Sequence, residues 1–508
     1  MNLLQVVKNA AMLSPDKVFA VCGKKKLTFK RFYERVLRAG AGFSRIGVKK
    51  GDKVALLLHN SIEFLEAYFG VISSGAVVVP INVFLKSEEI QFILNDCGVK
   101  ALVTSSDFEK TVNGINLSML PALENIISTD VMKKSKHIIF ETLFGKEKIS
   151  GIKMSQDDVA AIIYTSGTTG HPKGAMLAHK CLITDVENSR DIIAVTDKDV
   201  FMAFLPMFHA YSFAANVMMP LYCRCKLVIL KSVQPFDLVI KNLLLHRVSI
   251  FVAIPPIYSV LAERKLPFWF HILNPMRVCV SGGASLPVES FHKFEKSFNK
   301  PLIEGYGLSE ASPICALNPL FGERKAGSIG QAINNVEIKI VDDNGKEVPD
   351  SATGELIVKG DNVMLGYYNN PEATKEAIKD GWLYTGDMGM KDRDGYVFIQ
   401  DRKKDLIIIN GMNLYPREVE ELLYKHTAVA DCAVIGGTDK IHGEISVAVI
   451  KLKDNMKADE HEIRRYCKEH LANYKVPHRV EFWPELPRNE TGKILKREIK
   501  KAMELKHG

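Results

Sequence analysis

Apolar residues follow two different spacings along the first 150 residues, and the two spacings alternate. Residues 27–47 place apolar side chains at helical spacing and end on Gly47. Short runs rich in β-branched residues, at 53–60, 76–82 and 99–106, are typical of buried parallel strands. Strands that alternate with helices in this way predict an α/β fold, in which helices cover the faces of a mostly parallel sheet.

The alternation returns further along the chain, where runs at 225–231, 248–256, 276–283 and 300–307 predict more strands of this kind. Before them, residues 200–223 carry no fixed charge and would be long enough to span a bilayer. Prolines and polar side chains are spread through this stretch, and each would need a partner inside lipid. We therefore predict a buried helix whose start lines a pocket.

After about residue 325 the pattern changes to strict alternation of apolar and polar residues. Runs at 336–349, 354–360 and 395–401 are separated by Asn-Gly, Thr-Gly and Asp-Gly turns. Such runs predict antiparallel strands in a barrel-like arrangement. From Asp401 onward a charged stretch leads into mixed helical and strand patterns.

The chain is too long for one hydrophobic core, so two or more domains are expected. We predict a large N-terminal domain over residues 1–401, which includes an antiparallel β-rich subdomain at 325–400. A small, mobile α+β domain is predicted over residues 402–508.

Composition narrows the class of partner. The net charge of +8 is modest, and basic residues form short clusters such as 24–26 and 402–404, whereas a nucleic-acid binder concentrates its charge. A polyanionic small molecule or an anionic membrane surface fits at least as well.

The nine cysteines lie mostly in apolar runs, as buried free thiols do. The N-terminus lacks the apolar core of a signal peptide, which favours the cytoplasm. Peripheral contact with the inner membrane face and formation of a homodimer both stay open.

One loop carries the clearest chemistry. Residues 160–164 predict a strand, and Thr165 to Gly174 then supply three glycines, three threonines, a serine, a proline and a lysine. Glycine and small hydroxyl residues let N–H and O–H groups converge on an anion, and Lys173 adds a positive charge. A flexible linker has a similar composition but does not usually follow a buried strand. The loop therefore predicts a phosphate site.

Three other motifs that could indicate a nucleotide site or an esterase are absent or incomplete. Neither G-x-x-x-x-G-K-[ST] nor G-x-G-x-x-G occurs, so the two common nucleotide loops are excluded. Residues 307–311 nearly match the G-x-S-x-G turn of esterases, but alanine replaces the last glycine and no HGGG string occurs.

The string YTSGTTGHPKG at 164–174 resembles the phosphate loop of the adenylate-forming superfamily, which includes acyl-CoA synthetases, luciferases and peptide-synthetase adenylation domains. Its other motifs follow in the expected order. Residues 281–284 and 304–310 resemble the adenine-binding segments, 384–387 the ribose-binding motif, 401–405 the hinge, and 490–493 the segment of the C-terminal catalytic lysine. The resemblance covers nearly the whole chain and is closest to bacterial long- and medium-chain fatty acyl-CoA ligases.

The resemblance implies a reaction in two halves. A carboxylate attacks the α-phosphorus of ATP, which gives acyl-AMP and pyrophosphate, and the thiol of CoA then attacks the acyl carbon and releases AMP. ATP, Mg²⁺ and CoA are the expected cofactors, and a fatty acid is the expected substrate.

The resemblance also implies which residues act on ATP. Lys493 would bridge the carboxylate and the α-phosphate, Lys173 would bind the departing pyrophosphate, and Glu310 with Thr165 would hold Mg²⁺. The residues implied to contact ATP or AMP are Thr165, Ser166, Gly167, Thr168, Thr169, Gly170, Lys173, Gly283, Ala284, Glu304, Gly305, Tyr306, Gly307, Ser309, Asp387, Ile399 and Arg402.

Positions for the acid, the hinge and CoA follow in the same way. The implied acyl-pocket residues are His209, Phe213, Gly282 and Gly283, with Phe213 as an aromatic gate. A satisfied core histidine is the alternative for His209. Lys404 occupies the hinge position, and Gly411 is implied to lie near the incoming thiol.

Three functions remain distinct. The first is a fatty acyl-CoA synthetase. The second is an adenylating enzyme with another acid or acceptor, such as a ligase that uses acyl carrier protein or an aryl-CoA ligase. The third is a catalytically silent fatty-acid binder, which the presence of Lys493 and Glu310 disfavours.

Overall fold

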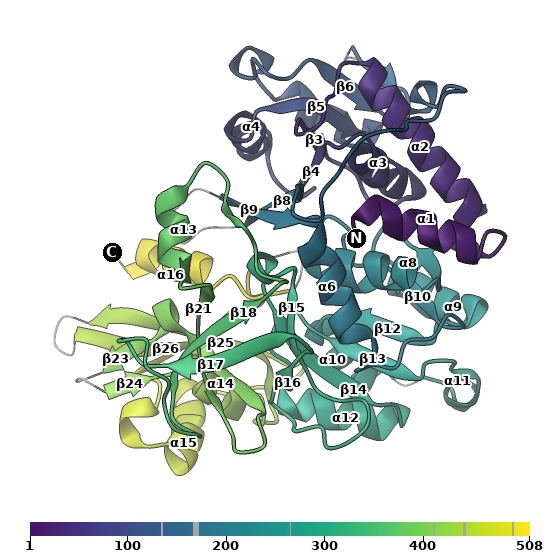
Figure 1. Cartoon of the computed structure of the whole chain (residues 1–508). Coiled ribbons are helices and arrows are strands. Elements are labelled where there is room, and N and C mark those ends of the chain that lie inside the picture. Colours follow the sequence, from purple (N-terminus) through teal and green to yellow (C-terminus); the bar gives the residue numbers. More distant parts are fainter. Residues whose placement is uncertain are drawn as a thin grey trace.

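Two large sheets form the centre of the molecule (Figure 1). The structure is a computed structural model, and it describes residues 1–133, 136–165, 172–264, 266–409, 412–439, 443–489 and 492–507.

The first sheet has eight strands and is parallel from β8 to β7, with antiparallel strands added beyond β8. Its order is β19 (Gly366–Tyr367), β9 (Lys173–Ala178), β8 (Val159–Thr165), β4 (Val77–Pro80), β3 (Lys53–Leu56), β5 (Val99–Thr104), β6 (Asn125–Ser128) and β7 (Ile138–Ile139). The strands predicted at 53–60, 76–82, 99–106 and 160–164 are confirmed as β3, β4, β5 and β8.

The second sheet has nine strands and is parallel from β14 to β1. Its order is β16 (Gln331–Ala332), β15 (Ile314–Leu317), β14 (Leu302–Gly307), β13 (Val278–Ser281), β12 (Ile250–Ala253), β10 (Val200–Ala203), β11 (Lys226–Ile229), β1 (Val18–Cys22) and β2 (Lys25–Thr28). The four strands predicted between 225 and 307 are confirmed as β11 to β14.

Side chains that alternate along each strand build a layered core. In β3, Val54 and Leu56 pack toward a helical layer that both sheets share, whereas Ala55 and the following Leu57 pack toward the outer side. The shared layer contains α1 (Leu3–Leu13), α2 (Phe29–Arg45), α3 (Ile62–Ser73) and α6 (His179–Arg190). The outer helices are α4 (Ser87–Asp96) and α5 (Glu109–Asn113) on the first sheet, and α9 (Phe236–His246), α10 (Pro255–Glu263), α11 (Phe268–Leu273) and α12 (Val288–Phe298) on the second.

The helix predicted at 27–47 is confirmed as α2, and its ends have local causes. The Thr28 hydroxyl oxygen accepts the Arg31 backbone N–H at 3.2 Å and so caps the first turn. Gly47 adopts a φ of 92°, which favours glycine and lets the chain leave the helix.

The uncharged stretch 200–223 is not one helix, and that prediction is wrong in part. It begins with strand β10, and its helical part is divided into α7 (Ala210–Ser212), a π-helical turn η4 (Phe213–Met218) and α8 (Met219–Tyr222). A strand buried on both faces and a buried helix are both uncharged, so charge alone could not separate them. In the described part of the chain, no helix combines the length and apolar character that crossing a membrane requires.

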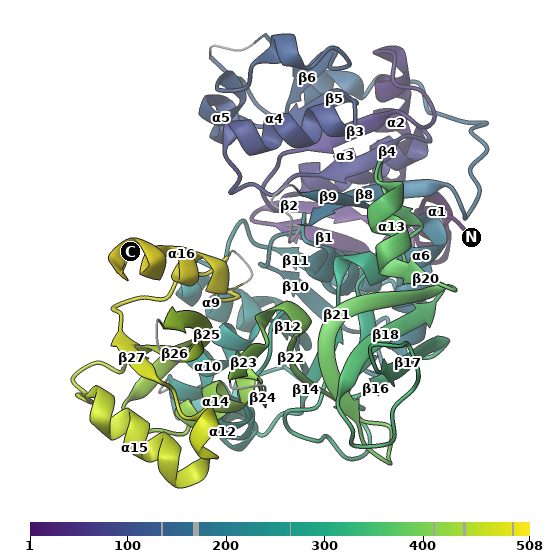
Figure 2. The same ribbon diagram turned by 90° about the vertical axis from the view of Figure 1, so that its left-hand side faces the viewer.

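The antiparallel region is a curled half-barrel of five strands (Figure 2). They are β17 (Val336–Val341), β18 (Gly354–Gly360), β20 (Ile378–Lys379), β21 (Trp382–Lys391) and β22 (Val397–Arg402), and α13 (Pro371–Ala377) precedes β20. The predicted domain boundary at 401–402 falls inside β22, where Arg402 still pairs with Asp387 of β21. The domain limits and the mobility of the second domain stay predictions.

The C-terminal elements gather on one side of the molecule in both views (Figures 1 and 2). A three-stranded sheet has separate apolar cores on its two faces, one against α14 and α15 and the other against α16. These elements are β23 (Ile407–Ile409), β24 (Met412–Leu414), α14 (Pro416–Leu423), β25 (Val429–Asp439), β26 (Gly443–Leu452), α15 (Glu460–His470), β27 (Arg479–Phe482) and α16 (Lys496–His507).

Candidate active site

A cavity of about 1810 Å³ lies where the carboxyl ends of both sheets meet the half-barrel and the C-terminal elements. Ligands of open α/β sheets bind at this edge, because the strands deliver their following loops to it. Thr165 ends β8, Ser281 ends β13 and Gly307 ends β14, and all three line the cavity.

The phosphate loop is described at its two ends. Thr165 pairs with Lys173 across β8 and β9, and both line the cavity. The amine of Lys173 lies 5.4 Å from the ring centroid of Tyr367. The predicted residues Ser166, Gly167, Thr168, Thr169 and Gly170 lie outside the described residues, as does Gly411.

Glu310 lies beside the start of this loop. Its Oε1 accepts hydrogen bonds from the Thr165 hydroxyl at 3.2 Å and from the Tyr367 hydroxyl at 3.0 Å. The fold therefore brings Thr165 and Glu310 together, although they lie 145 residues apart in the chain. The pair places one carboxylate and two hydroxyl groups next to the phosphate loop.

Asp387 and Arg402 also meet, as the ribose-binding hypothesis requires. The Arg402 Nε lies 2.6 Å from the Asp387 Oδ1, and the Tyr306 hydroxyl donates to the Asp387 Oδ2. Asp387 is buried, whereas the side chain of Arg402 is 37% exposed, so water reaches the pair from the arginine side. The carboxylate keeps lone pairs for further donors, because two oxygens can accept about four hydrogen bonds.

The glycines around Tyr306 have a packing role that sequence reasoning missed. A Cβ at Gly307 would lie 1.4 Å from the Pro313 carbonyl oxygen, and one at Gly305 would lie 2.4 Å from the Leu317 side chain. The two glycines are needed for the close antiparallel pairing of β14 with the segment that contains β15, whether or not they contact adenine. Ser309 follows in the same segment and lines the cavity.

Glu304 supports a neighbouring loop. Its buried Oε1 accepts the Leu286 backbone N–H at 3.0 Å, and burial raises the pKa of its carboxyl to about 7. The loop that it supports carries Gly282, Gly283 and Ala284, which all line the cavity.

Tyr211 packs on that loop and was not predicted. Its hydroxyl donates to the Ala253 carbonyl at 3.2 Å, and a Cβ on Gly282 would come within 3.0 Å of its ring. Gly283 has a φ of 81°, which strains any other residue. Gly282 therefore leaves room for the Tyr211 ring.

His209 lines the cavity as predicted, and desolvation lowers the pKa of its imidazole to about 4. Its ring is therefore neutral near pH 7. The Nδ1 accepts the Tyr211 N–H at 3.3 Å, so the ring also caps the helix that follows.

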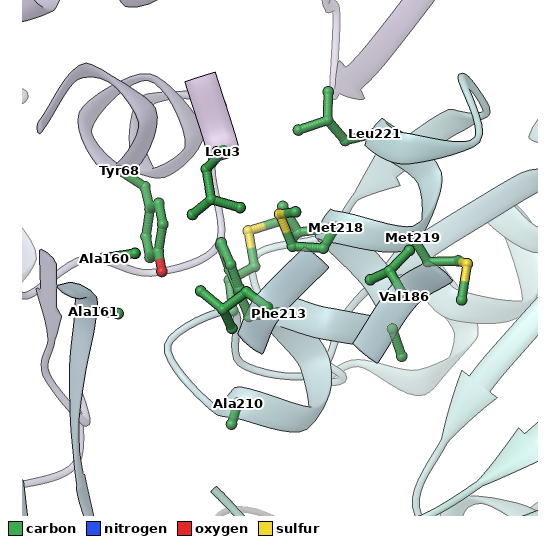
Figure 3. Close-up of a cluster of buried hydrophobic side chains, with 14 of the residues drawn as sticks. Leu3, Tyr68, Ala160, Ala161, Val186, Ala210, Phe213, Met218, Met219 and Leu221 are labelled. Carbon is green, nitrogen blue, oxygen red and sulfur yellow. The ribbon is translucent and has the colours of Figure 1, made fainter. Parts of the chain in front are cut away.

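Phe213 does not line this cavity, unlike the other residues of the predicted acyl pocket, and its role as an aromatic gate stays a prediction. Its ring stacks on Tyr68 at 4.2 Å between centroids, inside the shared helical layer (Figure 3). Tyr211, Ala215 and Met219, spaced by four residues, line the cavity instead. Phe213 lies two positions from Tyr211 and Ala215, which turns it to another side of the helix.

Lys493 enters the cavity from the C-terminal elements on a short hairpin. Its backbone N–H donates to the Asn489 side chain at 2.8 Å. Arg488 donates to the Gly492 carbonyl and pairs with Asp431, which fixes the hairpin on the C-terminal sheet.

The hairpin fits closely against the large sheets. Gly492 has a φ of 75°, and a Cβ there would lie 3.0 Å from atoms of both Ile254 and Pro256. Desolvation and the nearby charge of Arg402 lower the pKa of the Lys493 amine to about 8. Lys493 thus lies near Arg402 in the cavity.

Three remaining predicted residues line the same cavity. Ile399 lies in β22, Arg402 ends that strand, and Lys404 lies in the turn η6 (Lys403–Asp405) that follows it. The cavity therefore brings together every predicted site residue that the structure describes, apart from Phe213.

The chain matches the AMP-binding enzyme family over residues 7–368 and the AMP-binding enzyme C-terminal domain over residues 418–493. The chain belongs to the AMP-binding enzyme family. It is 35% identical to a long-chain-fatty-acid–CoA ligase of Bacillus subtilis (strain 168), over 98% of this chain and 94% of that protein.

Several solved structures are similar to this chain along its whole length. An anthranilate CoA ligase in complex with anthranoyl-AMP has a TM-score of 0.93 at 28% identity, over 100% of this chain and 98% of that one. ATP-bound MatB from Rhodopseudomonas palustris has a TM-score of 0.92, and apo MatB one of 0.79, each at 28% identity and covering 100% of both chains. This AMP-binding enzyme is an adenylate-forming acid–CoA ligase.

The described residues of this AMP-binding enzyme fit a magnesium ion that arrives with its nucleotide. Within the described ranges, no group of three or more His, Cys, Asp or Glu side chains could hold a metal. Mg²⁺ bound to phosphates needs only one or two carboxylates and keeps several waters. Glu310, with the Thr165 hydroxyl beside it, meets that need.

Two tyrosines that line the cavity escaped prediction. Tyr211 and Tyr367 both lie in strings that resemble the family, but an aromatic residue in an apolar or glycine-containing string predicts packing equally well. Their hydroxyl partners, at Ala253 and Glu310, are distant in sequence.

Proposed function

We propose that this AMP-binding enzyme joins a fatty acid to CoA. In the first half-reaction a fatty carboxylate oxygen attacks the α-phosphorus of ATP, and the bond to pyrophosphate breaks. In the second, the CoA sulfur attacks the acyl carbon, the bond to AMP breaks, and the thiol proton leaves to solvent.

The uncharged inner wall of the cavity carries this proposal. Between residues 189 and 252 its lining consists of Ser189, Ile193, Phe201, Phe208, His209, Tyr211, Ala215, Met219 and Val252. With His209 neutral, none of these side chains is charged near pH 7. An acyl chain can bury its methylenes there at a gain of about 0.8 kcal/mol for each one. The Bacillus subtilis relative, whose name states a long-chain fatty acid, adds support.

The other cavity residues then take complementary roles. Lys493 would neutralise charge between the carboxylate and the α-phosphate, and Lys173 would bind the departing pyrophosphate. Mg²⁺, held by Glu310 and Thr165, would supply charge neutralisation at the phosphates. The higher TM-score against ATP-bound than against apo MatB supports an arrangement suited to the nucleotide.

The acid and the acceptor can be tested together. AMP release should be measured with acids from acetate to oleate and with benzoate and anthranilate, with CoA or acyl carrier protein as acceptor. We expect the highest kcat/KM with a medium- or long-chain fatty acid and CoA. A preference for acetate or for an aromatic acid would overturn the fatty-acid proposal, and transfer to carrier protein alone would replace CoA.

A narrower cavity should shorten the accepted acid. Ala215 lies on the cavity face between Tyr211 and Met219, so Ala215→Trp should fill the acyl section. We expect kcat/KM for a long-chain acid to fall by about a hundredfold, which corresponds to roughly three buried methylenes. The rate with a short acid is the internal control and should change less than threefold. An equal loss for both acids would contradict the placement of the chain.

The first half-reaction should also depend on the charge of Lys493. Below pH about 8 the amine is protonated in the free enzyme, and above it the amine is neutral. We therefore expect kcat/KM for ATP in acyl-AMP formation to fall as pH rises through about 8. Lys493→Arg keeps the charge, so its residual activity should show no such fall. The same fall in both proteins would assign the titration to another group.

A further inference from the structure

Helix α14 begins beside strand β22, and the two are joined by hydrogen bonds across the predicted hinge at Lys404. The backbone N–H of Arg417 donates to the Asp401 Oδ2 at 2.9 Å. The Arg417 Nη1 donates to the Ile399 carbonyl at 2.6 Å. Both acceptors precede Lys404 in the chain, and both donors follow it.

Asp401 supplies a cap that α14 lacks within its own sequence. The N-cap residue Tyr415 makes no side-chain cap bond, and Pro416 has no N–H, so Arg417 bears the first free N–H of the helix. The carboxylate of Asp401 occupies the place of an N-cap side chain, where negative charge is favourable. The cap of α14 therefore comes from a strand on the other side of the hinge.

Burial strengthens the hydrogen bonds of Asp401 and Arg417. Asp401 is 9% exposed and the side chain of Arg417 is 12% exposed, so water screens neither strongly. The Asp401 Oδ1 also accepts the N–H of Arg402, which holds the carboxylate in place. Asp401, Ile399 and Arg417 all line the cavity that Lys493 enters.

We propose that Asp401 and Arg417 form a latch that holds the C-terminal elements in the arrangement that brings Lys493 to the α-phosphate. This inference rests on the proposed two-step function and deepens it. A rotation about Lys404 carries α14 away from β22, so it must break both bonds. The latch therefore stabilises the arrangement for acyl-AMP formation and contributes nothing to an arrangement in which α14 has moved away.

Lys403 provides a matched control for the latch. It lies next to the hinge and is also cationic, and its amine pairs with Asp343 at 2.8 Å and Glu355 at 3.1 Å. All three residues precede Lys404, so a rotation about Lys404 leaves these ion pairs intact. Lys403→Ala should therefore leave both half-reactions within about twofold of the wild-type rates, as surface ion pairs contribute little.

Separate rates for the two half-reactions distinguish loss of the latch from a general loss of folding or activity. Acyl-AMP formation should be measured in single turnover with whichever acid the wild-type enzyme activates, and thioester formation from supplied acyl-AMP and CoA. In Asp401→Ala and Arg417→Ala we expect acyl-AMP formation to fall about tenfold or more, as loss of a charged hydrogen bond predicts. Thioester formation should stay within about twofold. An equal fall in both half-reactions, or an equal loss in Lys403→Ala, would overturn the latch.

A conservative variant and a conformational readout complete the test. Arg417→Lys keeps a cationic donor that can reach toward the Ile399 carbonyl, so it should recover part of the rate lost in Arg417→Ala and can replace that variant if it does not fold. Trypsin should cleave the cluster 402–404 several times faster in Arg417→Ala than in the wild type with ATP present, because the hinge is more often free. Unchanged cleavage would contradict the latch even if the rates changed. A wild-type enzyme that activates no fatty acid would refute the proposed substrate and leave the latch test intact with another acid.

Discussion

Lys493→Ala should abolish acyl-AMP formation while thioester formation from supplied acyl-AMP largely survives. Lys493 lies on a hairpin that Arg488 fixes to the C-terminal sheet, and it is close enough to Arg402 for that charge to lower the pKa of its amine. Negative charge grows between the attacking carboxylate and the α-phosphate, and loss of one positioned cation there costs about a hundred- to a thousandfold. We expect a loss of at least that size in single-turnover formation of acyl-AMP.

The second half-reaction is the control for this variant. Thioester synthesis involves no attack on the α-phosphate of ATP and so does not need the positive charge of Lys493 there. Its rate should remain within about fivefold of wild type. Lys496→Ala is a less suitable comparison, because Lys496 pairs with Glu420 at 2.8 Å inside the C-terminal elements. Lys500, a partly exposed lysine of α16 that also lines the cavity, is a better control, and Lys500→Ala should keep both activities. Full adenylation by Lys493→Ala would remove the central residue of the proposed mechanism.

Glu310→Gln should have the second-largest effect. Glutamine keeps the shape and can still accept the hydrogen bonds from Thr165 and Tyr367, but it removes the negative charge. An amide oxygen is a weaker ligand for Mg²⁺ than a carboxylate. We expect acyl-AMP formation to fall about a hundredfold at millimolar Mg²⁺ and to recover in part as Mg²⁺ is raised.

A matched substitution elsewhere on the cavity wall tests whether the effect is local. Glu289 also lines the cavity, where it pairs with Lys293 at 2.6 Å, and Glu289→Gln should leave the Mg²⁺ dependence unchanged. Chelation of Mg²⁺ should stop the wild-type enzyme. A Glu310→Gln variant with wild-type Mg²⁺ dependence would reassign the metal ligand.

Sequence patterns predicted those features that local chemistry determines. Strands such as β3 and β13 can be predicted from short β-branched runs. The turn between Asp387 and Arg402 brings the two strands that carry them into one antiparallel pair. The resemblance to a known family then placed Glu310 and Lys493, whose roles no local pattern reveals. Their meeting at one cavity depends on the three-dimensional fold.

Other features depend on contacts that a sequence does not display. Phe213 and Tyr211 are both aromatic and two residues apart, yet one stacks in the core and the other lines the cavity. The phase of a helix that contains a π-helical turn decides between them, and hydrophobicity does not. In the same way, nothing around Asp401 in the sequence predicts that it caps a helix sixteen residues further on.

The placement of strand β1 affects how the chain acquires its structure. β1 and β2 precede the whole first sheet in the chain, yet β1 pairs with β11 at the far edge of the second sheet, where Ala20 faces Leu227. During synthesis, the parallel strands of the first sheet are therefore completed before β11 exists. The partner of β1 lies about two hundred residues further along the chain. Until β11 has been synthesised, only β2 can pair with β1, and the other edge of β1 is unpaired and a hazard for aggregation. The two sheets consequently cannot be separated into independently folding halves by cutting the chain at any single point between them.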